Sequence, residues 1–267
     1  MAPTHPDRGT EVRAYRERNS TADRALDILG LFSEQKLTIS AAELAAEFGV
    51  ARSTAYRYLQ TLMAAGFLEE SPTGGFRLGL RVFELARLAR RSYGLSDIAL
   101  PLLRALADAT GETALLTRRS GGRAICLERV ESESQRMRLT YERGSALALN
   151  AGASAWVLLA WEPTDVVEAL LAANPLSRYT DRTLTDREEI LERLRAVRGQ
   201  GFAVSYGELD PDAIGIGAPI FAPDGTVVAG VSVVAVQRRT EGLVDEIVDQ
   251  VRSAAASITR SLALVGN

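Results

Sequence analysis

The stretch from Ile39 to Gly66 most constrains how this chain can fold, because it predicts two short helices joined by a tight turn. Ser40 and Glu43 have the spacing of a capping box at the start of the first helix. Apolar residues at helical spacing follow, and Gly49 is expected to end that helix because glycine adopts a left-handed conformation without a Cβ penalty. The second helix is predicted over about residues 52–65.

The second helix has a narrow apolar stripe at Ala55, Leu59 and Leu62, which leaves its other side free to face a partner. In the DNA major groove, arginine reads guanine, glutamine reads adenine, and serine and threonine reach phosphates or bases. The pattern is therefore typical of a helix-turn-helix (HTH), with a solvated helical hairpin as the alternative. The expected DNA-contacting residues are Ser40, Arg52, Ser53, Thr54, Tyr56, Arg57, Gln60 and Arg77.

A short β-hairpin is predicted directly after the second helix. Leu68–Glu70 and Phe76–Leu78 are expected strands, and the residues between them are turn formers. A hairpin at this position is the wing of a winged HTH, on which Arg77 would contact a phosphate. Residues 21–79 are thus predicted to be a DNA-binding domain, preceded by a polar tail over residues 1–20 that we expect to be disordered.

These segments also carry a family resemblance. The runs RALDIL at residues 24–29, AAELAAEFGVARSTAYRYLQTL at 41–62 and GGFRLGLRVFEL at 74–85 resemble the IclR family of bacterial transcriptional regulators. The resemblance covers nearly the whole chain. It continues through TGET at 110–113, LERVES at 127–132, GASA at 152–155, VRGQGFAVS at 197–205 and GAPIFAPDGTVVAGVSV at 217–233. It implies a linker helix over residues 80–94 that joins a dimer contact, and a GAF-like effector-binding domain over residues 95–267.

The pattern of the second domain itself predicts an α+β fold, with strands bracketed by helices and many of them antiparallel. Ser96 is the expected cap of its first helix, and Thr185 with Glu188 has the spacing of a second capping box. Gly215 and Gly217 indicate close backbone approach within a strand rather than a dinucleotide-binding loop. The expected strands cover residues 113–119, 124–130, 136–140, 146–149, 202–205, 213–221 and 227–236.

The chain has few of the residues that catalysis or metal binding needs. Its single histidine is His5, in the tail, and its single cysteine is Cys126. This argues against Ser-His-Asp and Cys-His catalysis and against thiolate metal sites, so neither a cofactor nor a metal is expected. We expect Cys126 to be a small core residue, and the carboxylates of Glu131 and Glu133 to be solvated.

Composition also bears on the compartment and the partners. One cysteine, the lack of an apolar run of membrane length and the lack of an apolar signal core indicate a cytoplasmic protein without a membrane partner. The net charge of −3 does not by itself suggest nucleic acid. The acidity lies mostly in the second half, however, so a basic surface at Arg52, Arg57, Arg77 and Arg81 is compatible with it.

The resemblance places an effector site in the second domain, between the sheet and the helix that carries GASA. We expect the N-terminus of that helix to offer free backbone N–H groups to a carboxylate. Some family members have acidic residues where Ser205 and Tyr206 stand, a cysteine near Gly215 and a second serine near Val234. These departures favour a ligand with an aromatic or aliphatic body over a small oxo-acid. The alternative for Tyr206 and Trp156 is that they only fill the core. The expected effector-contacting residues are Ala151, Gly152, Ala153, Ser154, Ser205, Tyr206, Glu208, Ile214, Gly215, Ser232 and Val234.

Taken together, the sequence predicts a ligand-responsive transcriptional regulator, expected to be a repressor and not an enzyme. Its expected partners are double-stranded operator DNA, a small organic effector and a second copy of itself, as a dimer or a dimer of dimers. Two alternatives stay open: a second domain with hydrolase activity, or a sensor or scaffold without DNA binding.

Overall fold

The computed structural model describes residues 20–33, 35–132 and 142–265, which form two compact units that divide between Ser92 and Tyr93. Each unit is described by itself. Apart from Ser20, which begins helix α2 (Ser20–Gly30), the predicted N-terminal tail lies outside the described residues. The predicted strand over residues 136–140 lies outside them as well.

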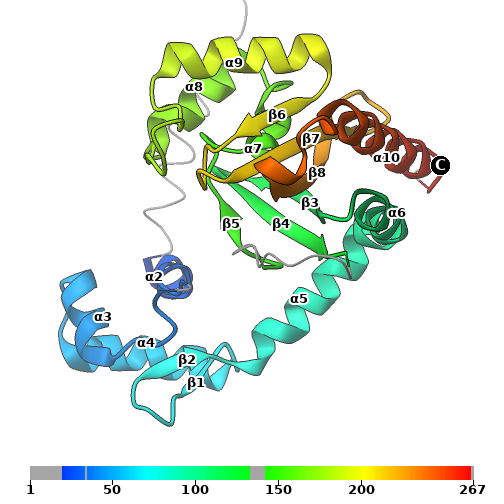
Figure 1. Ribbon diagram of the computed structural model, residues 1–267. Helices are drawn as coiled ribbons and strands as arrows, with labels where there is room; N and C mark the ends of the chain where they lie inside the picture. Colours follow the sequence, from blue (N-terminus) through cyan, green and yellow to red (C-terminus); the bar gives the residue numbers. More distant parts are fainter. Residues whose placement is uncertain (1–19, 34, 133–141, 266–267) are drawn as a thin grey trace, which may run out of the picture. The chain divides into compact units, whose positions relative to one another are not determined.

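The N-terminal unit is a winged HTH, as predicted (Figure 1). After α2 come α3 (Ala41–Phe48) and α4 (Arg52–Ala64), the hairpin of β1 (Leu68–Glu70) and β2 (Phe76–Leu78), and α5 (Leu80–Tyr93). One apolar core joins the three helices to the wing. Its buried members are Ile28, Ile39, Ala41, Leu44, Ala55, Leu59, Leu62, Leu68 and Phe76.

Local hydrogen bonds fix the two ends of α3 as the sequence predicts. The Ser40 hydroxyl accepts from the Glu43 N–H at 3.2 Å, and the Glu43 carboxylate accepts from the Ser40 N–H at 2.8 Å. These hydrogen bonds from Ser40 hold the pKa of the Glu43 carboxyl below its usual value. Gly49 ends the helix in the left-handed region, with φ of 61°. Ile39 pairs with Phe76 through two backbone hydrogen bonds, which tie the start of α3 to the wing.

The C-terminal unit is built on one six-stranded antiparallel sheet of order β5-β4-β3-β8-β7-β6 (Figure 1). The strands are β3 (Thr113–Ser120), β4 (Arg123–Val130), β5 (Ala146–Leu147), β6 (Ala203–Tyr206), β7 (Ala213–Phe221) and β8 (Val227–Val236). Helices α6 (Leu95–Thr110) and α10 (Val244–Val265) pack on one face, where they form a core with the sheet. Helices α7 (Ala153–Leu159), α8 (Thr164–Ala173) and α9 (Arg187–Gln200) form a second core on the other side. This confirms the predicted α+β fold.

Three glycines let α7 lie directly against the sheet. A Cβ at Gly217 would come within 3.2 Å of the Ala153 carbonyl oxygen, and one at Gly230 within 2.8 Å of a Val157 methyl. A Cβ at Gly215 would lie 2.7 Å from the Ser205 hydroxyl. The predicted close backbone approach at Gly215 and Gly217 is therefore confirmed.

Two of the predicted helix caps in this unit are wrong. Helix α6 begins two residues earlier than a cap at Ser96 would place it. Its N-cap is Gly94, no side chain caps it, and Ser96 lies inside the helix. At α9 the cap is Asp186, whose carboxylate accepts from two first-turn N–H groups, while the Thr185 hydroxyl accepts from Arg178. A carboxylate caps a helix as well as a hydroxyl does and also interacts favourably with the helix dipole. This explains why the cap of α9 is Asp186 and not Thr185.

Gly79 provides a test of the N-terminal unit, because a Cβ there would overlap the carbonyl oxygen of Gly66. We expect Gly79→Ala to lower the free energy of unfolding of this unit by about 1–3 kcal/mol, as overpacking does. Gly30→Ala is the matched control, since a Cβ at Gly30 meets nothing within 4 Å. Hydrogen exchange of residues 20–92 in the full chain measures both, and equal protection in the two variants would contradict the packing described.

Candidate functional sites

Burial decides which side of α4 is available to a partner. Ala55 and Leu59 are completely buried and Leu62 nearly so, whereas the side chains on the opposite side of the helix are open to solvent. No side chain caps the first turn of α4, so its N-terminal end can still accept an anion. The predicted contact residues on the open side are Arg52, Ser53, Tyr56, Arg57 and Gln60, which are exposed, and Thr54, which is half-buried.

Three of the predicted DNA-contacting residues are already engaged within the unit. The Ser40 hydroxyl is used by the capping box. The Tyr56 ring lies edge-on to the Phe76 ring of the wing, with centroids 6.0 Å apart, while 42% of the residue stays exposed. Arg77 forms an ion pair with Glu69 on the neighbouring strand at 2.7 Å, so its charge is partly offset. The open arginines of α4 are therefore better placed than the wing to supply positive charge.

Most of the predicted effector residues come together at the start of α7, whereas Tyr206 lies exposed on the opposite side of β6. The Ser154 hydroxyl lies 2.8 Å from the Ser232 hydroxyl of β8, and the Ala153 N–H donates to the Ser205 hydroxyl of β6 at 3.1 Å. Ile214 and Gly215 are buried neighbours on β7, and Gly215 pairs with Val234. Ala151 is buried directly before the helix.

Two of the N–H groups that were expected to be free at this helix end already have partners. The Glu208 carboxylate accepts the Gly152 N–H at 2.7 Å and the Trp156 indole N–H at 2.7 Å, through the same oxygen. The Ala153 N–H is taken by Ser205. The chain thus supplies its own carboxylate and hydroxyl where a ligand was expected, because buried donors need partners whether or not a ligand is bound.

Trp156 and Tyr206 have opposite environments. Trp156 is completely buried in the core between α7, α8 and α9, in keeping with the core-filling alternative. Tyr206 is 42% exposed and does not fill core. Burial raises the pKa of the Glu208 carboxyl. Hydrogen bonds from Gly152 and Trp156 and the positive charge of Arg193 oppose that effect in part.

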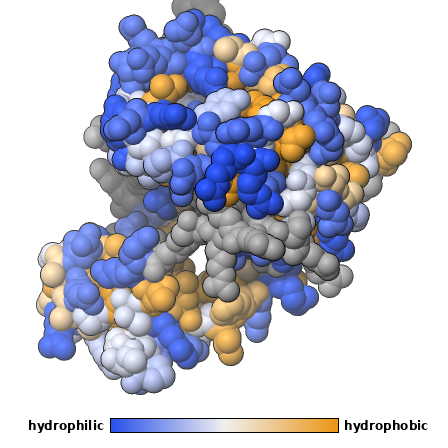
Figure 2. Space-filling model, viewed as in Figure 1, coloured by the Kyte–Doolittle hydropathy of each residue, from blue (hydrophilic) through white to orange (hydrophobic). Residues whose placement is uncertain are grey.

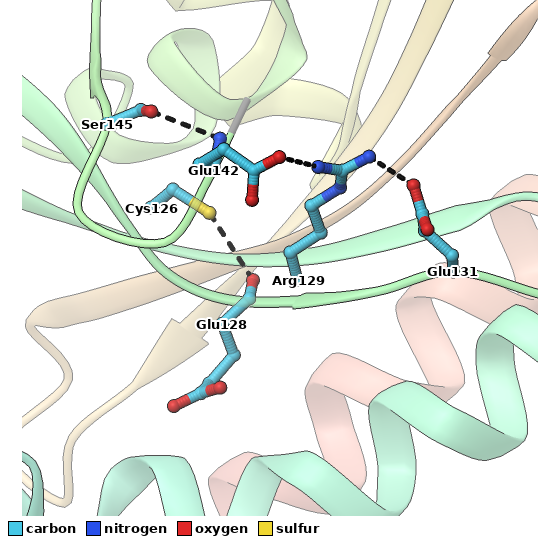
Figure 3. Close-up of polar contacts among 6 residues, drawn as sticks. All are labelled: Cys126, Glu128, Arg129, Glu131, Glu142 and Ser145. Atoms are coloured by element: carbon cyan, nitrogen blue, oxygen red, sulfur yellow. Dashed lines mark hydrogen bonds and ion pairs between the residues drawn. The ribbon is translucent and has the colours of Figure 1, made fainter. Parts of the chain in front are cut away.

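Two titratable residues of β4, Cys126 and Arg129, have structural partners. Cys126 is fully buried, its thiol donates to the Glu128 carbonyl oxygen at 3.5 Å, and burial raises its pKa to about 11, as expected for a core residue (Figure 3). Arg129 forms ion pairs with both Glu131 and Glu142 (Figure 3). Glu131 is therefore exposed but paired, and Glu133 lies outside the described residues.

The described residues contain neither a candidate metal site nor an apolar helix of membrane length. No group of three or more His, Cys, Asp or Glu side chains among them could hold a metal ion. None of their helices has both the length and the apolar character needed to span a membrane.

Substitution of Glu208 tests its role at α7. In Glu208→Gln, one amide oxygen can still accept both N–H groups, whereas Glu208→Ala leaves two buried donors unpaired and should cost about 2–4 kcal/mol of stability. Because the folded-state pKa of Glu208 is raised, the wild-type chain loses stability relative to Glu208→Gln as pH rises through that pKa. Denaturant unfolding over a pH series that begins below 4.5, the ordinary pKa of this carboxyl, and extends upward measures this difference. A difference that does not change with pH would contradict the account.

Both units match known families of proteins. Residues 21–72 match the profile described as the IclR helix-turn-helix domain, and residues 89–260 match the profile described as the C-terminal domain of the bacterial transcriptional regulator IclR. The HTH-type transcriptional regulator KipR of Bacillus subtilis is 31% identical over 246 residues, which cover 92% of this chain and 98% of KipR.

Solved structures agree with these matches. An IclR-type regulator from Silicibacter sp. TM1040 is 30% identical and superposes with a TM-score of 0.83, covering 91% of this chain and 96% of that one. An IclR homologue from Microbacterium hydrocarbonoxydans, solved in complex with 4-hydroxybenzoate, is 26% identical with a TM-score of 0.77. That match covers 91% of this chain and 98% of the homologue.

Proposed function

This chain belongs to the IclR family of DNA-binding transcriptional regulators, and from that premise we propose that α4 reads operator DNA while the C-terminal unit senses a small organic acid. The observation that carries the first half is the composition of α4. Arg52, Arg57 and Gln60 are exposed on one side of a helix that contains no acidic residue. Base edges and phosphates are the partners that such a surface recognises.

The wing has a secondary part in this proposal. Arg77 reaches a phosphate only by exchanging its ion pair with Glu69 for one with DNA. An exposed pair of this kind contributes at most about 1 kcal/mol, so the exchange costs little. The wing therefore adds affinity that depends on salt, while α4 provides the sequence preference.

We propose that the effector lies beside the first turn of α7, with an aromatic or aliphatic body and one carboxylate. The 4-hydroxybenzoate bound by the Microbacterium homologue is a ligand of that class. The Ser154 and Ser232 hydroxyls can exchange their mutual hydrogen bond for bonds to a ligand at little net cost. Since Glu208 already occupies the Gly152 N–H, most of the binding free energy would come from apolar contact.

The direction of regulation is proposed to be repression, in the cytoplasm. A protein that occupies operator DNA beside a promoter competes with polymerase without any further contact. The ligand can change that outcome only by binding one arrangement of the protein more tightly than another. We assign no enzymatic activity, because no group of side chains in the described part of the chain favours the hydrolase alternative.

Self-association is proposed through α5. Leu80 and Phe83 are 70% and 72% exposed, and Leu88 is 47% exposed on the same helix. Apolar residues are visible at the surface of the N-terminal unit (Figure 2). A helix that leaves large apolar side chains in water gains free energy when a second copy covers them, which supports a homodimer or a dimer of dimers.

Phe83→Glu tests the dimer. A charge in the proposed contact should weaken self-association at least tenfold, by analogy with other buried unpaired charges at interfaces. The control is Arg187→Ala, which makes the same change in net charge at an exposed residue of the C-terminal unit and should leave self-association unchanged. Sedimentation velocity over a concentration series measures both variants, and an unchanged dimer in Phe83→Glu rules out this contact.

Arg57→Ala tests DNA recognition. Loss of a bidentate contact to a base costs about 1–3 kcal/mol, so operator affinity should fall roughly tenfold to a hundredfold at fixed salt. Arg187→Ala, an exposed arginine of the C-terminal unit, is the control with the same change in net charge. Fluorescence anisotropy with a DNA fragment from the region upstream of the gene that encodes this protein gives both affinities. Equal affinity of wild type and Arg57→Ala would mean that this side of α4 does not read DNA.

A further inference from the structure

A cleft of about 450 Å³ opens at the edge of the sheet formed by β6, where α9 and the loop before it adjoin that strand. Its volume is in the range of small-molecule sites. Apolar and aromatic side chains form much of its lining, including Leu184, Phe202 and Tyr206. Arg182 and Arg193 line it from two different segments, and Glu208 also lines it.

Arg182 is held over the cleft by the structure of its loop. The Thr180 and Thr183 hydroxyls donate to the carbonyl oxygens of Gly207 and Glu208, each at 2.6 Å, which pins the loop to the end of β6. The Arg182 side chain then passes so close to Gly207 that a Cβ there would lie 3.3 Å from it. Its guanidinium forms no ion pair with any described residue.

Arg193 is placed by a backbone contact. Its guanidinium donates to the carbonyl oxygen of Val204, on the open edge of β6, from the side of α9. No carboxylate among the described residues pairs with it within 4.0 Å. Two guanidinium groups and one carboxylate therefore line one cleft whose other lining is largely apolar, and this excess of positive charge attracts an anion.

Glu208 separates this cleft from the predicted effector site. Its carboxylate holds Gly152 and Trp156 on the α7 side, while the same residue lines the cleft. Tyr206, assigned to the effector site from sequence, also lines the cleft, whereas the neighbouring Ser205 is buried and bonds to α7. Alternate residues of β6 point to opposite sides, so the two spaces are distinct.

We propose that the β6–α9 cleft is a second ligand site, which binds a small carboxylate through Arg182 and Arg193 and packs its aromatic or aliphatic body against Tyr206, Phe202 and Leu184. Binding there places a new negative charge beside Glu208, the residue that fixes the start of α7. A ligand in the cleft would thus change the electrostatic environment at the start of α7 without entering the effector site. This proposal does not depend on DNA recognition by α4, and its test is independent of the tests of that function.

The full-length protein and 4-bromobenzoate provide the test, because bromine can be located in crystals by anomalous scattering. The expected result is a bromine peak among Tyr206, Phe202 and Leu184, with the carboxylate directed at Arg182 and Arg193. Bromine found only beside Gly152, Ser154 and Ser232, or at neither place, overturns the proposal.

Affinity in solution provides the second measurement. Calorimetric titration with 4-bromobenzoate should show at least fivefold weaker binding in Arg182→Gln, and the neutral 4-bromobenzamide should bind wild type at least tenfold more weakly. Arg195→Gln, on the exposed side of α9 and outside the cleft, is the matched control and should bind as wild type does. Arg182 is a better position for substitution than Arg193, because the Arg193 guanidinium bonds to the Val204 carbonyl oxygen whereas that of Arg182 makes no hydrogen bond that the fold needs. Unchanged affinity in Arg182→Gln, or equal loss in Arg195→Gln, contradicts the proposal.

Discussion

The burial of one narrow apolar stripe on α4 determines what the N-terminal unit can do. Ala55 and Leu59 are fully enclosed by α3, α2 and the wing, and Ala55 has no bulk that would hold the helices apart. With that side fixed, the helix cannot rotate, and Arg52 and Arg57 must face outward. Rigid placement matters because direct readout of bases depends on the position of each donor to within a fraction of a hydrogen-bond length.

The C-terminal unit depends on the close packing of α7 on the sheet, which requires glycines and a partner for buried polar groups. Glycines at 215, 217 and 230 let α7 sit on the sheet, and that contact buries polar groups at the start of the helix. Glu208 satisfies two of them with one oxygen, in a place where burial disfavours its charge. A helix held in this way is firmly packed yet dependent on one carboxylate, so ligands that alter the surroundings of Glu208 can influence it.

Local signals explain why the winged HTH was predictable from sequence. Ser40, Glu43 and Gly49 define α3 through contacts with near neighbours, and the turn after Glu70 defines the wing in the same way. The family resemblance placed Glu208 in the same site as Gly152, but as a ligand contact. Its role as hydrogen-bond partner of the α7 N-terminus was not predicted, because the two residues lie 56 positions apart and only the fold brings them together. No sequence pattern indicates that Arg182 and Arg193 share a site, since only the folded loop and α9 bring them to β6.

The most direct measurement is selection of sheared genomic DNA by the purified full-length protein, at fixed salt, followed by sequencing of the retained fragments. A regulator that reads bases through α4 should enrich fragments that share one short sequence present twice, with centres about 34 Å or a multiple of that distance apart. Retention of all fragments in proportion to their abundance, with or without added carboxylic acids, would contradict the assignment of α4 as a recognition helix.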